Sequence, residues 1–227
     1  MKRHFEEVED ELKYRLLHMG SLVEEMIHFA VSSLLERTPE TLAQVHEKEK
    51  LVNQLHIEVD DRCFKILALY QPTANDLRFV MGAIKINADL ERIGDQAVNI
   101  SQTTSILLNF PQLEKRLFDI PRMAELAKKM LKDALDAYVK KDVELARSVL
   151  KRDEEEDKLK SSSFHELMQL MQADSSSIQR ALGLILISRN LERIADHATN
   201  IAEDVIFMVL GKDIRHHQEE SEPSASA

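Results

Sequence analysis

Apolar residues recur at intervals of three and four along most of the chain, which is the spacing of amphipathic helices. The first such stretch predicts one long helix over residues 5–36. The Thr38-Pro39 pair that follows predicts a new helix start, because threonine suits the N-cap and proline the first helical position. This second helix is expected to run to about Tyr70, where a Gln-Pro pair stops it.

A third helix is predicted to open at Thr73 or Asn75 and to reach about Leu108. A connector rich in turn residues and charge then extends to Pro121. We take this connector as the domain boundary, so that the first domain covers residues 1–112.

Beyond the connector the same apolar pattern restarts at an offset of 104 residues, which falls to 101 by the final motif. Asp142 and Asp174 are suited to cap the fifth and sixth helices. The second domain is expected over residues 113–211, and the polar composition of residues 212–227 predicts a disordered tail. The repeated core positions are Met19, Leu22, Met26 and Ala30, matched by Met123, Leu126, Met130 and Ala134.

Long helices joined by short turns run antiparallel, so the pattern predicts an all-α fold of two tandem, pseudo-symmetric, antiparallel three-helix bundles with six long helices. The scarcity of glycine and proline, five of each, and the absence of tryptophan favour long helices over a turn-rich β fold. The third helix of each repeat has a second apolar face, which predicts that it is covered on two sides. In the first repeat this face comprises Ile86, Leu90, Ile93, Ala97 and Ile100.

The duplication is clearest in two segments of the predicted third and sixth helices. Residues 90–100 return as residues 191–201, with differences only at Gly94, Gln96 and Val98. At 100° per residue, the oxygen-bearing side chains of each segment continue a face that begins as an apolar stripe. In the first repeat Glu91, Asp95 and Asn99 follow Leu77, Val80, Met81, Ile84 and Ala88; in the second Glu192, Asp196, Asn200 and Glu203 follow Ile178, Ala181, Leu182 and Ile185.

Carboxylates that are buried without partners are costly, so each stripe requires a cation, a basic partner or water. Hard metal ions prefer oxygen ligands, and facing helices can present several of them. The second and fifth helices supply further pairs four residues apart. The sequence therefore predicts a metal site in each repeat, with candidate ligands Glu49, Asn53, Glu91, Asp95 and Asn99 in the first and Asp153, Asp157, Glu192, Asp196 and Asn200 in the second.

A plainer interpretation is that Arg92 and Arg193 satisfy the neighbouring aspartates as ordinary ion pairs. His56 and Asp60 lie on the face of Glu49 and could extend the first site.

Their counterparts in the second repeat, Lys160 and Phe164, cannot bind a metal. Within the acidic run 153–157 only the two outer aspartates are expected to face inward, and His197 is expected on the surface.

Several function classes are excluded or disfavoured. A formal net charge of −10 without a basic stripe argues against nucleic acid as a partner. The single cysteine, Cys63, fits a reducing compartment such as the cytoplasm, and we expect neither a signal peptide nor a membrane span. No Glu-x-x-His pair accompanies the acidic motifs, and no phosphate loop or nucleophile elbow is present, so we expect no enzymatic activity.

From about Phe5 to Gly211 the chain resembles the PhoU family of phosphate-specific transport accessory proteins. The resemblance rests on L-E-R-I-G-D, on L-E-R-I-A-D-H-A-T-N-I-A-E and on the P-T-x-x-D-L-R turn that begins at Pro72. It implies a cytoplasmic, often dimeric protein of two three-helix bundles. It also implies negative regulation of the phosphate starvation response through contact with the phosphate importer ATPase and the sensor histidine kinase, reaching the membrane only through these partners.

The resemblance further implies multinuclear iron or zinc clusters, or other divalent ions such as Mn or Mg, at E(D)-x-x-x-D motifs. These motifs correspond to Glu49, Asn53, Glu91 and Asp95 in the first repeat and to Asp153, Asp157, Glu192 and Asp196 in the second.

Asn53 departs from the family's acid and lowers the charge of the first site. The second repeat also lacks the P-T-x-x-D-L-R turn. The leading hypothesis is a metal-binding regulatory adaptor, homodimeric and cytoplasmic. The alternatives are a metal-dependent enzyme or metal store and a purely structural scaffold.

Overall fold

The computed structural model describes residues 2–113 and 119–214. Within these residues the secondary structure is helical, with six long α-helices, two short 3₁₀ turns and no strand, which confirms the predicted fold class. The 3₁₀ turns η1 (Pro39–Thr41) and η2 (Ser175–Ser177) precede the second and sixth helices. The helices are α1 (Lys2–Glu36), α2 (Leu42–Tyr70), α3 (Ala74–Leu107), α4 (Ile120–Lys140), α5 (Val143–Ala173) and α6 (Ile178–Leu210).

Two of the predicted helix caps form a hydrogen bond through their side chains. Asp142 caps α5, where its Oδ1 accepts a hydrogen bond from the backbone N–H of Leu145 at 3.0 Å. Asp174 caps η2 in the same way, accepting from the N–H of Ser176 at 2.9 Å. Thr38, however, makes no capping bond through its side chain, and the chain forms a 3₁₀ turn before α2 begins.

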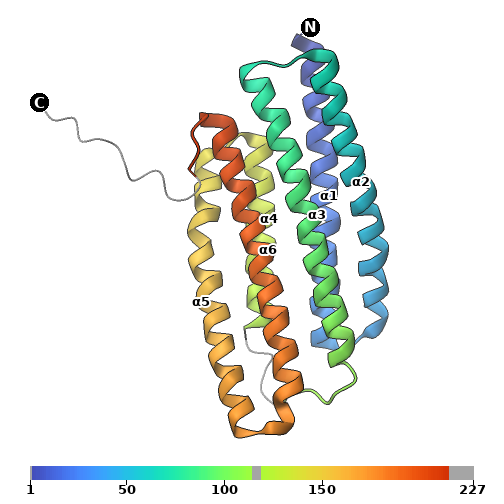
Figure 1. The fold of residues 1–227 in the computed structure, drawn as a ribbon, viewed down its shortest axis with the longest axis vertical. Coiled ribbons are helices and arrows are strands. Elements are labelled where there is room, and N and C mark those ends of the chain that lie inside the picture. The colour runs from blue at the N-terminus through green and yellow to red at the C-terminus, as the bar shows by residue number, and fades with distance from the viewer. Residues whose placement is uncertain (1, 114–118, 215–227) are drawn as a thin grey trace, which may run out of the picture.

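The six helices form two bundles that lie side by side. Helices α1, α2 and α3 pack against one another, as do α4, α5 and α6. Helices α3 and α6 run along each other where the bundles meet, and α1 also contacts α4 (Figure 1). The repeated methionines are fully buried in the cores, as predicted: Met19, Met26, Met123 and Met130.

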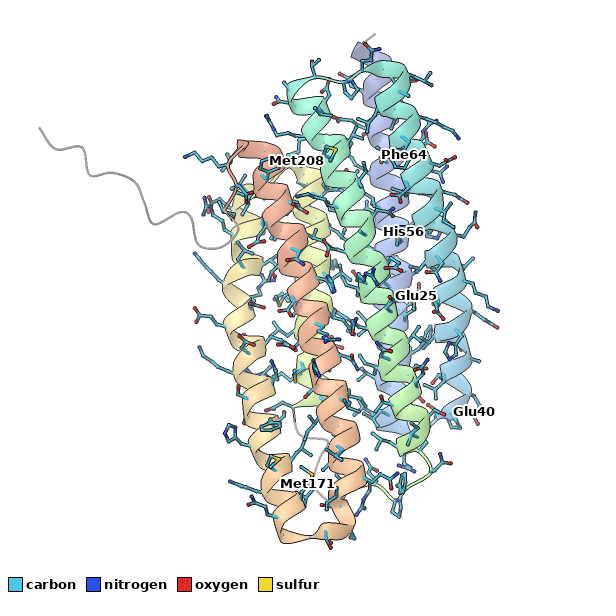
Figure 2. The ribbon with its side chains drawn as sticks, viewed as in Figure 1. Glu25, Glu40, His56, Phe64, Met171 and Met208 are labelled. Atoms are coloured by element: carbon cyan, nitrogen blue, oxygen red, sulfur yellow. The ribbon has the colours of Figure 1, made fainter. Side chains whose placement is uncertain are left out.

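Two glycines lie where α3 and α6 contact each other. At Gly183 of α6, a Cβ atom would lie 2.7 Å from Cδ2 of Leu107 on α3. At Gly82 of α3, a Cβ atom would meet Met208 at ordinary van der Waals distances. Met208 lies near the C-terminal end of α6 (Figure 2). The second apolar face of α3 is fully buried; its residues are Ile86, Leu90, Ile93, Ala97 and Ile100.

The apolar stripes that lead to the acidic motifs are less buried than expected. Leu77 and Met81, in the first turns of α3, are 40% and 41% exposed, and Ile178 and Leu182 of α6 are similarly accessible. The second apolar face of each helix points at the core, so these stripes lie at its outer edge. The acidic motifs therefore lie at the margin of each bundle and not inside it.

The C-terminal end of α6 is marked by Gly211, which has the left-handed conformation with φ 68° and suits a residue without a side chain. Ile214 then buries its side chain against the core. The predicted disordered tail, 212–227, falls largely on residues 215–227, which are outside the described part of the chain. None of the described helices has the length and apolar character of a membrane span.

Candidate functional site

In the first bundle the predicted ligands lie on α2 and α3. Glu49 is half-buried, with an Oε2 atom 3.5 Å from Nδ1 of His46. Asn53 and Asn99 are exposed. On α3 one guanidinium serves both acids: Nε of Arg92 lies 3.5 Å from Glu91, and Nη1 lies 3.4 Å from Asp95. The placement of these acids matches the ion-pair interpretation in this repeat.

His56 and Asp60, the possible extensions of the first site, are engaged with each other and with α3. Nε2 of His56 lies 3.5 Å from Oδ2 of Asp60 (Figure 2 labels His56). The buried Asn87 of α3 donates to Oδ1 of Asp60 at 3.0 Å and to the backbone carbonyl of His56 at 2.9 Å. These contacts tie α2 to α3.

In the second bundle the predicted carboxylates are close enough to influence one another. Burial and the charges of Asp157 and Glu192 raise the pKa of Asp153. Burial and the charges of Glu192, Asp153 and Asp157 raise the pKa of Asp196 to about 6. Mutual repulsion of this kind favours a bound cation or proton.

The structure adds Glu156 of α5 to this group, and it is the most deeply buried of the acids. Its side chain is fully buried, and neither carboxylate oxygen has a hydrogen-bond partner. Burial and the charges of Asp153, Glu192, Glu155 and Asp157 raise its pKa to about 8. The prediction that only the outer aspartates of the acidic run face inward was wrong, since Asp157 is exposed. The repeat offset was the available signal, because Glu156 corresponds to the core residue Val52.

We define the second acidic cluster as Asp153, Glu156, Asp157, Glu192 and Asp196. Nζ of Lys160 binds Oε1 of Glu192 in this cluster, and this hydrogen bond raises the pKa of the lysine. Lys160 corresponds to His56 of the first repeat. Beside Glu192 and Asp196 a hollow of about 550 Å³ opens between α5 and α6, and its basic side chains are Lys160, His165, Arg189 and Arg193.

Asn200 and His197 of α6 are directed toward the other bundle. Nδ1 of His197 lies 2.8 Å from Oδ1 of Asp89 on α3, and Nδ2 of Asn200 donates to the same oxygen at 3.4 Å. The expectation that His197 is a surface residue was wrong, because the close approach of α3 covers it. The structure thus places Asn200 at the junction of the bundles.

The donor atoms of the second acidic cluster are all oxygens, which are the ligands that hard divalent and trivalent cations prefer. The two carboxylate oxygens of Glu156 have no hydrogen-bond partner, so they are suited to contact a cation. In residues 2–113 and 119–214, no three His, Cys, Asp or Glu side chains are positioned to hold one metal ion together. Metal binding at this cluster therefore requires side-chain rotation and release of Glu192 by Lys160.

Comparison with known proteins gives consistent matches over both repeats. The model of the PhoU domain family matches residues 16–104 and 120–205. A phosphate-specific transport system accessory protein PhoU homolog of Pseudomonas putida is 38% identical over 207 residues, which cover 91% of this chain and 81% of the relative.

Two solved structures have the same fold. The crystal structure of PhoU from Pseudomonas aeruginosa matches with a TM-score of 0.88 and 36% identity, covering 92% of this chain and all of that one. The phosphate transport system regulatory protein PhoU from Streptococcus pneumoniae matches with a TM-score of 0.85 and 29% identity, covering 92% and 98%. The duplicated helical bundles and the matches to both repeats establish that the chain belongs to the PhoU family.

Proposed function

We propose that this protein is a regulatory adaptor that represses phosphate uptake and the phosphate starvation response. It acts in the cytoplasm as a homodimer, by contacting the ATPase subunit of the phosphate importer and the phosphate sensor histidine kinase. The observation that carries the proposal is the match of both bundles to proteins described as phosphate-specific transport accessory proteins. Family membership makes phosphate transport the relevant process, and the partners and the direction of regulation are the proposed part.

We also propose that the adaptor binds divalent or trivalent metal ions through the repeated acidic motifs. The second acidic cluster supports this part. Burial and the neighbouring acidic charges raise the pKa of Asp153 and Asp196, and a cation would offset the repulsion between these charges. A metal held there would crosslink α5 to α6 and stiffen the surface that partners meet. Arg92 competes with a metal in the first bundle and Lys160 in the second.

The regulatory role is tested by binding and by gene deletion. Purified chain is mixed with the importer ATPase subunit or the cytoplasmic part of the sensor kinase, and complex formation is measured by light scattering after gel filtration. We expect a complex with at least one partner. We also expect that deleting the gene activates a phosphate-starvation reporter in phosphate-rich medium. Absence of both complexes together with an unchanged reporter overturns the role.

The metal part has a separate test with a matched control. The double variant Glu192→Gln/Asp196→Asn removes two charges from the cluster, whereas Glu154→Gln/Glu166→Gln removes two from the exposed side of α5. Protein stripped of metal is titrated with Mn²⁺ by calorimetry. We expect weaker binding only in the first variant, and equal binding in both variants contradicts the proposed site.

A further inference from the structure

An exposed apolar strip extends from the hollow between α5 and α6 toward the turn that joins these helices. Phe164 of α5 and the half-buried Ile185 of α6 line the hollow. Toward the turn, which lies beyond Met171 (Figure 2), further apolar residues recur at intervals of three and four and share a face with these two. All of them, and Phe164 itself, are exposed over 38–49% of their surface. We define the apolar strip as Phe164, Met168, Ile178, Leu182 and Ile185.

Packing inside the bundle does not account for the strip. The faces of α5 and α6 that point into the core are supplied by other residues, among them Leu167, Leu184 and Ile187, which are buried. A single exposed apolar side chain needs no explanation, whereas neighbouring ones on two packed helices mark a surface that another molecule covers. The strip therefore indicates a docking surface.

Two arginines follow the strip along α6. Arg189 and Arg193 lie one turn apart, line the hollow and are exposed. Among residues 2–113 and 119–214 neither guanidinium takes part in an ion pair. The acid Glu192 comes after Arg189 and is already bonded to Lys160. An acidic group that approaches from the strip therefore meets an arginine first, whereas a small anion deeper in the hollow meets carboxylates.

The first bundle does not combine these features. Asp60 takes the place of Phe164, so a charge interrupts the apolar strip there. Ala88 takes the place of Arg189, and Arg92, at the position of the second arginine, already pairs with two acids of its own helix. The first bundle is thus an internal control for the second.

We infer that the apolar strip and the two arginines form a docking groove for an amphipathic helix of a partner protein, a helix that carries acidic residues at one end of its apolar face. The inference rests on the proposed adaptor role and names the surface and the chemistry through which the adaptor meets a partner. From Ile178 to Arg193 the groove extends about 22 Å along α6, which is about four helical turns. A helix with apolar residues every three or four positions can lie along such a groove, and its acidic end then pairs with the arginines.

Two synthetic peptides of about 18 residues test the inference. Both are amphipathic helices with the same leucine stripe; one has glutamates in the polar positions of its last turn, and the other has lysines there. Binding of the labelled peptides to the whole chain is measured by fluorescence anisotropy at low and high salt, with EDTA to exclude metal. Inorganic phosphate is titrated separately by calorimetry.

Two double variants remove the two parts of the groove separately. Phe164→Ser/Leu182→Ser removes apolar surface, and Arg189→Glu/Arg193→Glu reverses the charge. Circular dichroism verifies that each variant is folded. The milder variants Phe164→Ala and Arg189→Gln replace any that is not.

Each double variant has a matched control. Phe64→Ser/Met81→Ser removes exposed apolar surface from the first bundle. Lys151→Glu/Lys158→Glu reverses two exposed charges on α5.

We expect wild type and both controls to bind the glutamate peptide at least tenfold more tightly than the lysine peptide. This preference should shrink at high salt, because ions screen the arginines. The serine variant of the strip should bind the glutamate peptide at least tenfold more weakly. The charge-reversed variant should prefer the lysine peptide, a gain that a loosened or unfolded protein does not show.

Three results overturn the inference. The first is that wild type binds neither peptide, or binds both equally. The second is that phosphate binds to wild type but not to the charge-reversed variant while no peptide binds, which assigns the hollow to a small anion. The third is that wild type is dimeric and the serine variant of the strip monomeric by light scattering, which shows that a second copy of the chain covers the strip.

The proposed partners separate a failure of the inference from a failure of the adaptor role. The same variants are mixed with the importer ATPase subunit and with the cytoplasmic part of the sensor kinase. If these partners bind the groove variants as they bind wild type, the inference is wrong and the adaptor role stands. If wild type binds neither partner but discriminates between the peptides as expected, the groove stands and the proposed partners are wrong.

Discussion

Nδ1 of His197 on α6 lies 2.8 Å from Oδ1 of Asp89 on α3, so a polar pair connects the two bundles at their junction. Both side chains are mostly buried, with exposed fractions of 22% and 15%. The pair has no equivalent in the repeat, since the matching positions hold Gln96 and Asn190. It therefore belongs to the junction and not to the internal architecture of either bundle.

Removing the histidine should weaken this junction. His197→Leu leaves the Asp89 carboxylate with one long bond from Asn200, and we expect a loss of about 1–3 kcal/mol in the free energy of unfolding. The measurement is urea denaturation at pH 7. His165→Leu, at an exposed position of α5, is the control and should change stability by less than about 0.5 kcal/mol. Equal effects of the two substitutions would show that the pair adds nothing to stability.

At the same junction, substitution of alanine for two glycines should change the stability of the protein in opposite directions. At Gly82 the added methyl group meets Met208 at 3.7 Å or more, so Gly82→Ala gains helix propensity and should stabilise by about 0.5–1 kcal/mol. At Gly183 the methyl group meets three atoms of Leu107 between 2.7 and 3.1 Å. The leucine must then move out of its packed position, and we expect a net loss of about 1 kcal/mol or more.

Thermal unfolding of the two alanine variants beside wild type checks the glycine prediction. A higher midpoint for Gly183→Ala than for Gly82→Ala would mean that the helices separate freely at this contact, and that the junction is looser than its packing indicates.

The stability of the metal-free protein should fall as the pH rises. Burial raises the pKa of Glu156 from its ordinary 4.5 to about 8, so between these values the folded chain holds a proton that the unfolded chain has lost. The stabilisation is complete below pH 4.5 and disappears as the pH passes 8. Asp196 acts in the same direction up to about pH 6. For Glu156 alone the full change is on the order of 5 kcal/mol.

Urea denaturation in EDTA at pH 5.5, 7 and 8.5 measures this effect. Glu156→Val isolates the contribution of the glutamate, because its advantage over wild type should grow as the pH increases. An advantage that stays constant across the three pH values would show that Glu156 titrates normally, and hence that water reaches it.

Most of the fold could be predicted from the sequence, because the signals for helices are local in the chain. The apolar spacing sets the faces, and proline, aspartate and glycine mark the ends, as Asp142 and Gly211 illustrate. What spacing does not encode is how far a neighbouring helix covers a given face. Leu77 and Met81 share the stripe of Val80, yet only Val80 is fully buried, because α3 exposes its outer edge in these turns.

The candidate site was harder to predict, because charge and position gave conflicting signals. For Glu156 the repeat offset indicated a core position and the acidic run indicated a solvated one, and the structure follows the offset. Lys160 appeared only as a residue unable to bind metal, since a helical pattern does not show that a long side chain reaches Glu192. The pairing of His197 with Asp89 required knowledge of which helices meet between the bundles.

Cys63 should be inert toward thiol reagents while the protein is folded. Its side chain is fully buried, and burial together with the charge of Asp60 raises the pKa of the thiol to about 12. At pH 8 the thiolate, which is the reactive form, is therefore a minute fraction of the population.

We expect Ellman's reagent to label the native protein at least a hundredfold more slowly than the protein in 6 M guanidinium chloride. Labelling should accelerate with urea in parallel with unfolding, because the reagent reaches the thiol only when α2 separates from its bundle. Fast labelling of the native protein, at a rate independent of urea, would instead show that α2 opens locally without unfolding of the first bundle.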